Sequence, residues 1–171
     1  LMSSHNGISK LFPHLLTFCL AVHFAAGIHR SLYDFYVPYS AGKETAEYIK
    51  EQGWSDQVIF GTRDVEVSTV SGYLDREIYY PELTGFGSYA QWNNRISLNR
   101  EDTLLHVQGY FASHPETRRL LLVLSKDSAF RDMKQGDVIV QDGLRIKSEQ
   151  KFVRSWIKPE RFYLYWAEQI D

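Results

Sequence analysis

Residues 120–124, LLLVL, contain no polar side chain, which is what a central strand covered by helices on both faces requires. On either side of this stretch the chain alternates between helical and extended patterns. We expect helices over 41–52, 65–74 and 100–113, and further strands over 57–60, 77–80, 88–92, 138–140 and 161–166. This alternation predicts an α/β domain in three layers, with a mostly parallel sheet and helices on both of its faces.

Polar residues at three positions indicate where the helices begin. Ser40 and Asp64 are good N-cap residues for the first two helices, because their side-chain oxygens can accept hydrogen bonds from the free backbone N–H groups. Asn99, followed three residues later by Asp102, has the form of a capping box for the third helix.

The overall composition excludes several classes of protein. The chain has 171 residues, with 19 Lys and Arg against 21 Asp and Glu, and a net charge of -2. A near-neutral chain without a basic stripe argues against nucleic acid as a partner. The single cysteine, Cys19, permits no internal disulfide, and the scattered histidines give no metal-ligand spacing. Neither phosphate-cradling glycine motif is present, so we expect no nucleotide, no metal and no other cofactor.

The run 11–29, LFPHLLTFCLAVHFAAGIH, contains no Asp, Glu, Lys or Arg and lies between Lys10 and Arg30. As a helix it covers roughly 28 Å, close to the hydrocarbon thickness of a bilayer. We therefore expect a transmembrane helix with a short flank in 1–30 and a soluble domain in 31–171, with the lipid bilayer as a partner. A secretory signal peptide and a buried or amphipathic soluble helix remain alternatives, and His23 inside the run requires a neutral or partnered ring.

Ligands of open α/β sheets bind beyond the carboxyl ends of the strands. In this chain those ends carry residues 61–64 after the first strand and residues 125–127 after LLLVL. One interpretation is a small polar pocket there. The other is that Asp64 caps a helix and its neighbours face water.

Three segments of the chain carry a resemblance to a known family. They are DFYVPYSAGKETAEYIKEQG (34–53), QVIFGTRDVEVSTVSGYLDREIYYPE (57–82) and the closing RFYLYW (161–166). Together they resemble the C-terminal region of bacterial polytopic glycosyltransferases of the GT-C type. The matching positions are Asp34, Pro38, Tyr39, Ser40, Asp64, Gly72, Tyr73, Leu74, Arg76, Tyr79, Tyr80, Pro81, Glu160, Arg161, Tyr163, Leu164 and Tyr165.

This resemblance implies an accessory domain of an inner-membrane enzyme that transfers a sugar from a polyprenyl-phosphate donor. The soluble domain would lie on the extracytoplasmic, periplasmic side. The catalytic carboxylate of such enzymes lies in an early loop, so the resemblance assigns no catalytic residue to this chain. The upstream membrane region of the same protein would be a partner, and Arg63, Asp64, Arg76 and Tyr80 would contact the polyprenyl-phosphate sugar or the glycan acceptor.

Two other functions compete with the transferase hypothesis. One is a single-pass anchored or secreted α/β module that binds a small polar ligand or a protein without catalysis, and the other is a soluble enzyme. Sequence upstream of Leu1 separates them, because further apolar spans favour the transferase and a short charged start favours the binding module. As the chain begins with Leu1 rather than Met, we expect either a fragment or a chain from which an upstream segment has been removed.

Overall fold

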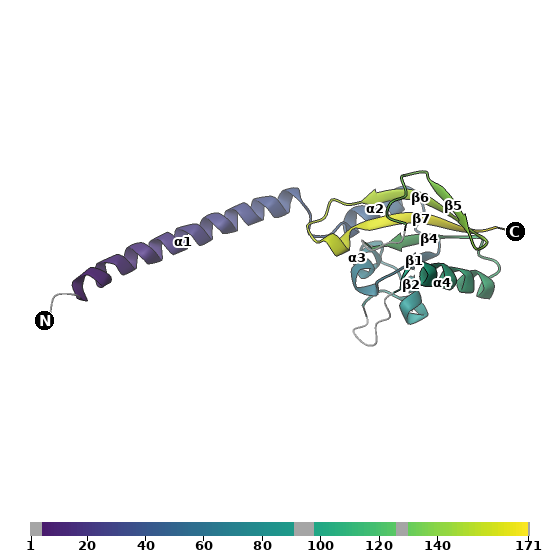
Figure 1. Cartoon of the computed structure of the whole chain (residues 1–171), viewed down its shortest axis with the longest axis horizontal. Coiled ribbons are helices and arrows are strands. Elements are labelled where there is room, and N and C mark those ends of the chain that lie inside the picture. The colour runs from purple at the N-terminus through teal and green to yellow at the C-terminus, as the bar shows by residue number, and fades with distance from the viewer. Residues whose placement is uncertain (1–4, 91–97, 126–129, 171) are drawn as a thin grey trace. The chain divides into compact units, whose positions relative to one another are not determined.

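The computed structural model describes residues 5–90, 98–125 and 130–170. It divides into two compact units, Leu1–Pro38 and Tyr39–Asp171. The described part of the first unit contains one long helix, and the second unit is an α/β domain (Figure 1).

The N-terminal helix α1 extends over His5–Tyr36. Within it, Leu11–Tyr33 forms a 23-residue span with a mean hydropathy of 1.7 and no buried residue, long and apolar enough to cross a membrane. The Nδ1 atom of His23 lies 2.9 Å from the Cys19 carbonyl oxygen, so a neutral ring has a hydrogen-bond partner within the helix. This meets the condition that a histidine inside the span imposes.

The α/β domain is built on one sheet of seven strands in the order β3-β2-β1-β4-β7-β6-β5. β2, β1 and β4 are parallel, whereas every other neighbouring pair is antiparallel. The strands are β1 (Ile59–Gly61), β2 (Ile78–Tyr80), β3 (Gly85–Gly87), β4 (Arg119–Leu124), β5 (Val138–Gln141), β6 (Leu144–Phe152) and β7 (Phe162–Gln169).

The expectation of an α/β domain is confirmed, but the expectation of a mostly parallel sheet is wrong. Parallel neighbours need a long crossover, and only the first half of the domain supplies one between strands. From β5 onward the strands follow one another without an α-helix between them, so they pair antiparallel.

Helices cover both faces of the sheet, which makes the three layers that the sequence predicts. α2 (Gly42–Glu51) and α3 (Asp64–Leu74) lie on one face, and α4 (Arg100–Ser113) lies on the other. Two short 3₁₀ turns, η1 (Pro81–Leu83) and η2 (Lys158–Glu160), follow β2 and precede β7.

The apolar strand β4 is the shared element of the two cores. Leu121 and Val123 face α2 and α3, whereas Leu120, Leu122 and Leu124 face α4, and all five are at most 2% exposed. Because neighbouring residues of a strand point to opposite faces, a stretch with no polar member fits only between two helical layers.

β6 crosses from one core to the other through an irregularity in its pairing. Ser148 pairs with Tyr165 and Gln150 with Leu164, which leaves Glu149 as an extra residue. Since one extra residue reverses the alternation of side chains, Ile146 packs on the α4 side and Phe152 on the α2 and α3 side.

The capping box at the start of α4 is confirmed. The Asn99 Oδ1 atom accepts from the Asp102 N–H at 2.9 Å, and the Asp102 Oδ2 atom accepts from the Asn99 N–H at 3.3 Å. The other two caps differ from expectation by one residue. The N-cap of α2 is Ala41, although the Ser40 hydroxyl still accepts from the Gly42 N–H at 2.9 Å.

The N-cap of α3 is Arg63, at φ 66°, and Asp64 is the first residue of the helix. The left-handed backbone at Arg63 turns the chain sharply out of β1, so the helix starts one residue earlier than it would with Asp64 as its cap. The strand expected over 88–92 is wrong for its described residues. β3 ends at Gly87, residues 88–90 are not in a strand, and residues 91 and 92 lie outside the described part of the chain.

A side chain at Gly61 has no room. A Cβ atom there would lie 2.7 Å from Val67 Cγ1 and 3.2 Å from Ile78 Cγ2, so α3 and β2 would have to move. We expect Gly61→Ala to lower the free energy of unfolding by about 1–3 kcal/mol, the usual cost of overpacking.

The measurement is denaturant unfolding of the full chain in mild detergent, with Gly109→Ala as the control. A Cβ at Gly109, in α4, meets nothing within 4 Å, and alanine favours a helix over glycine by about 1 kcal/mol. Equal shifts in the same direction for both variants would contradict the close packing around Gly61.

Candidate functional site

The carboxyl ends of β1 and β2 form the point where the chain connections diverge. β1 continues into α3 on one face of the sheet, whereas β2 continues through η1 and β3 toward α4 on the other face. Open α/β sheets bind ligands at such a point. The Thr62 N–H donates to the Val123 carbonyl at 3.3 Å, which ties the loop after β1 to the last part of β4.

Arg63 holds two glutamates at this end of the sheet. Its backbone N–H donates to Glu82 Oε1 at 2.6 Å, and its Nη2 atom lies 2.8 Å from Glu66 Oε1. Glu82 belongs to η1, directly after β2, whereas Glu66 belongs to the first turn of α3. The start of α3 therefore gathers carboxylates from two neighbouring strand ends, where the helix dipole favours negative charge.

The carboxyl group of Glu82 has a strongly perturbed pKa. Burial raises its pKa from 4.5 to about 7, and the nearby carboxylates of Asp64 and Glu66 act in the same direction. The backbone N–H of Arg63 opposes this rise by hydrogen bonding to the charged form. The Oε2 atom is buried and has no hydrogen-bond partner among the described residues. Such a group can gain or lose a proton near neutral pH.

Tyr80 lies near this carboxyl group. The residue is fully buried, and its hydroxyl has no hydrogen-bond partner in the described part of the chain. Burial raises the pKa of its phenol, and the Asp64 and Glu82 charges raise it further, while the nearby Ser71 hydroxyl lowers it. The Ser71 hydroxyl donates its own proton to the Arg76 carbonyl at 2.6 Å.

Three of the four residues expected at the site lie at one end of the sheet. Arg63 and Asp64 follow β1, and Asp64, at 4% exposed, lies close enough to Tyr80 to affect its pKa. Arg76 lies before β2, at the opposite end of that parallel strand, where its N–H and carbonyl bond with Ser71. The structure therefore does not bring Arg76 to Arg63 and Asp64, although Ser71 links its backbone to the surroundings of the Tyr80 hydroxyl.

The sequence reasoning missed Glu82 and Glu66 at this site. Glu82 follows the expected strand 77–80 by two residues, so the rule that selected residues 61–64 at the end of the first strand applied to it as well. Of the second expected loop, Ser125 is buried, and Lys126 and Asp127 lie outside the described residues.

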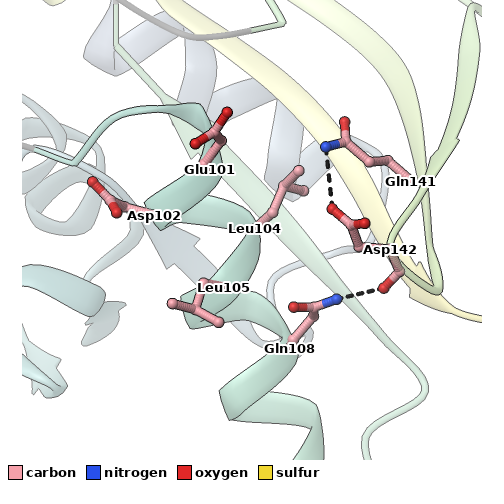
Figure 2. Close-up of a pocket in the computed structure, with 7 residues that line it drawn as sticks. All are labelled: Glu101, Asp102, Leu104, Leu105, Gln108, Gln141 and Asp142. Atoms are coloured by element: carbon pink, nitrogen blue, oxygen red, sulfur yellow. Dashed lines mark hydrogen bonds between the residues drawn. The ribbon is translucent and has the colours of Figure 1, made fainter.

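A hollow lies between α4 and the turn that joins β5 to β6. It has a volume of about 470 Å³ and is lined by Glu101, Asp102, Leu104, Leu105, Gln108, Gln141 and Asp142 (Figure 2). Its amide groups are already in use, because Gln108 Nε2 donates to the Asp142 carbonyl and Gln141 Nε2 donates to Asp142 Oδ2 at 3.1 Å. We therefore place the candidate site at the strand ends, where a buried carboxyl oxygen of Glu82 has no hydrogen-bond partner among the residues that the structure describes.

Within the described residues, no group of three or more His, Cys, Asp or Glu side chains is arranged to hold a metal ion. Comparison of the chain with protein-family models, curated proteins and solved structures gives no significant match.

We call the group formed by Arg63, Asp64, Glu66, Tyr80 and Glu82 the strand-end site. It has three carboxyl groups but one guanidinium group. Carboxylates accept hydrogen bonds from hydroxyl groups, and the Arg63 guanidinium can donate them. The excess of negative charge disfavours an anionic ligand. The site suits a neutral ligand rich in hydroxyl groups or a cationic one.

The raised pKa of Glu82 predicts a pH-dependent stability. The folded state holds this proton more tightly than the unfolded chain, so the contribution of Glu82 to the free energy of unfolding falls as pH rises from about 4.5 to about 7. Above pH 7 the charged form costs roughly 3 kcal/mol. We expect Glu82→Gln, whose amide oxygen can still accept from the Arg63 N–H, to be more stable than the wild type at pH 8 and equal to it near pH 4.5.

Denaturant midpoints at the two pH values measure this effect. Glu77→Gln is the control, because Glu77 is exposed at the opposite end of β2 and the difference from the wild type should not change with pH. A Glu82→Gln difference that stays constant between the two pH values would show that Glu82 ionises normally.

Proposed function

We propose that this chain is the C-terminal accessory domain of an integral-membrane glycosyltransferase that transfers a sugar from a polyprenyl-phosphate donor. In this proposal α1 crosses the inner membrane, the α/β domain lies on the periplasmic side, and the catalytic part lies upstream. The observation that carries the proposal is the span Leu11–Tyr33, of which no residue is buried. An exposed apolar helix of this length is stable in lipid and costly in water.

The chemistry of the strand-end site supports a role on the acceptor side of the reaction. The carboxylates of Asp64, Glu66 and Glu82 would repel the phosphate of a polyprenyl-phosphate sugar. The same groups, together with Arg63, can bind the hydroxyl groups of a glycan acceptor. The accessory domain would thus hold the acceptor, and the upstream membrane region would hold the lipid-linked donor.

The second candidate is a single-pass anchored or secreted module that binds a ligand or a protein without catalysis. The acidic character of the site favours it, since a cationic ligand fits three carboxylates as well as a glycan does. In the secreted form, the mature chain would lack the N-terminal segment.

The only thiol of the chain reports on α1 directly. Cys19 lies inside the span Leu11–Tyr33, where a charged maleimide cannot reach it through hydrocarbon. We expect Cys19 in isolated membranes to stay unlabelled, even when the vesicles are made permeable, and to react fully after denaturation in detergent.

The control is a Cys19→Ser, Ser113→Cys variant, whose thiol lies at the exposed end of α4 and should react in permeable vesicles. Labelling of native Cys19 at the rate of this control would contradict a membrane-embedded α1. A mature chain without Cys19, detected by its mass, would favour the secreted module.

The two arginines expected at the site allow a matched test of the transferase function. We expect Arg63→Gln to slow sugar transfer to the acceptor about tenfold, as the loss of a charged hydrogen bond does. Arg76→Gln, at the other end of β2, should leave the rate unchanged.

Initial rates are measured in membranes that carry the full-length protein, with a polyprenyl-phosphate sugar as donor. The wild type is measured first, because membranes that transfer no sugar would count against the transferase and favour the binding module. Where the wild type transfers sugar, unchanged rates for both variants would contradict a role of the strand-end site in transfer.

A further inference from the structure

The first residues of the α/β domain, from Tyr39 onward, are hydrogen-bonded to the connection between β6 and β7. The Ser155 hydroxyl and the Ile157 N–H both bond to the Tyr39 carbonyl, at 2.8 and 3.2 Å, and the Ala41 N–H donates to the Glu160 carbonyl at 3.1 Å. The start of the domain is thus fixed to this connection by three long-range hydrogen bonds.

This arrangement places two exposed aromatic rings side by side. The rings of Tyr39 and Trp156 lie 5.9 Å apart, and the two residues are 57% and 46% exposed. Val153 on the same connection is 47% exposed. Large apolar surface of this kind is costly in water, whereas Tyr and Trp are the residues enriched at membrane–water interfaces.

The connection also carries positive charge. Arg154 and Lys158 are exposed, and residues 153–158 contain no acidic side chain. Exposed basic residues near a membrane are attracted to anionic lipid headgroups. Aromatic rings flanked by such residues form the pattern of an interfacial anchor.

The length of chain after α1 keeps Tyr39 near the membrane surface. The apolar span ends at Tyr33, and the helix continues to Tyr36. Three further helical residues and three extended ones cover at most about 15 Å, and the headgroup layer is itself about 5–8 Å thick. Tyr39 therefore cannot move far from the headgroups once α1 is inserted.

We infer that the surface formed by Tyr39, Val153, Arg154, Trp156 and Lys158 docks onto the headgroup layer of an anionic bilayer, with the two rings at the interface. This docking rests on the proposed membrane insertion of α1 but adds a second contact, made by the α/β domain itself. It would limit how far the strand-end site can turn relative to the membrane.

Fluorescence quenching by brominated lipids tests this docking. The full chain is reconstituted into vesicles of phosphatidylcholine and phosphatidylglycerol whose acyl chains carry bromine near the headgroup. We expect Trp156→Phe to lower the quenched fraction of the tryptophan emission by about twofold or more, since a ring at the interface lies within contact range of the quencher.

Trp54→Phe is the matched control. Trp54 is half-buried against Tyr48 and Trp166 in the core, so its removal should not lower the quenched fraction. A double variant, Arg154→Gln with Lys158→Gln, tests the charges without altering a ring. It should lose quenching in the anionic vesicles and behave as the wild type in phosphatidylcholine alone.

The possible failures are distinguishable. If Cys19 is protected from maleimide but Trp156 contributes no quenching, α1 is inserted and this surface faces water or a protein, which overturns the docking alone. If Cys19 is labelled in the vesicles, the membrane anchor fails and the docking fails with it.

Discussion

A strand buried on both faces obtains its stability from two separate layers of side chains, and β4 is such a strand. Its residues alternate between the α2 and α3 core and the α4 core, and they pair with β1 on one side and β7 on the other. The rest of the domain follows from this constraint. A helix must cover each face, so the chain has to cross the sheet between α3 and α4, and that crossing produces the divergent strand ends where the candidate site lies.

The site shows how local bonding and burial oppose each other. The hydrogen bond from the Arg63 backbone N–H favours the charged form of Glu82. Burial and the nearby carboxylates of Asp64 and Glu66 disfavour that form, and burial has the largest effect on the pKa. A carboxyl group in this balance changes its charge near the pH of the cell, which is more typical of a binding or proton-transferring group than of a structural cap alone.

The sequence predicted the elements whose signals are local. The apolar stretch of β4 identified a doubly covered strand, and the Asn99 and Asp102 capping box located the start of α4 at Arg100. β6 was missed because it has few apolar residues and several charges, and the alternation of buried and exposed residues at its start breaks down after Ser148. The Asp142-Gly143 pair before it was an available signal. Both residues have positive φ, at 52° and 74°, as a two-residue hairpin turn requires.

The sequence did not predict whether neighbouring strands run parallel or antiparallel, or which residues the fold brings together at the site. Nothing in the local pattern of β5, β6 and β7 states whether a neighbour runs parallel, since this depends on the connections and on which edge of the sheet is free. Arg76 and Arg63 look alike in sequence, but α3 carries the chain along the sheet and leaves them at opposite ends of β2. The position of Glu82 depends on its hydrogen bond to the Arg63 N–H at the start of α3, which no spacing rule describes.

The central claim is that α1 anchors the α/β domain to a membrane and that this domain lies outside the cytoplasm. Carbonate extraction of membranes, combined with protease added to intact and to permeabilised cells, measures both parts at once. We expect the chain to resist extraction and the domain to be cut once the protease reaches the outer face of the inner membrane, without opening of the cytoplasm. Release by carbonate, or protection of the domain until the cytoplasm is opened, would contradict the claim.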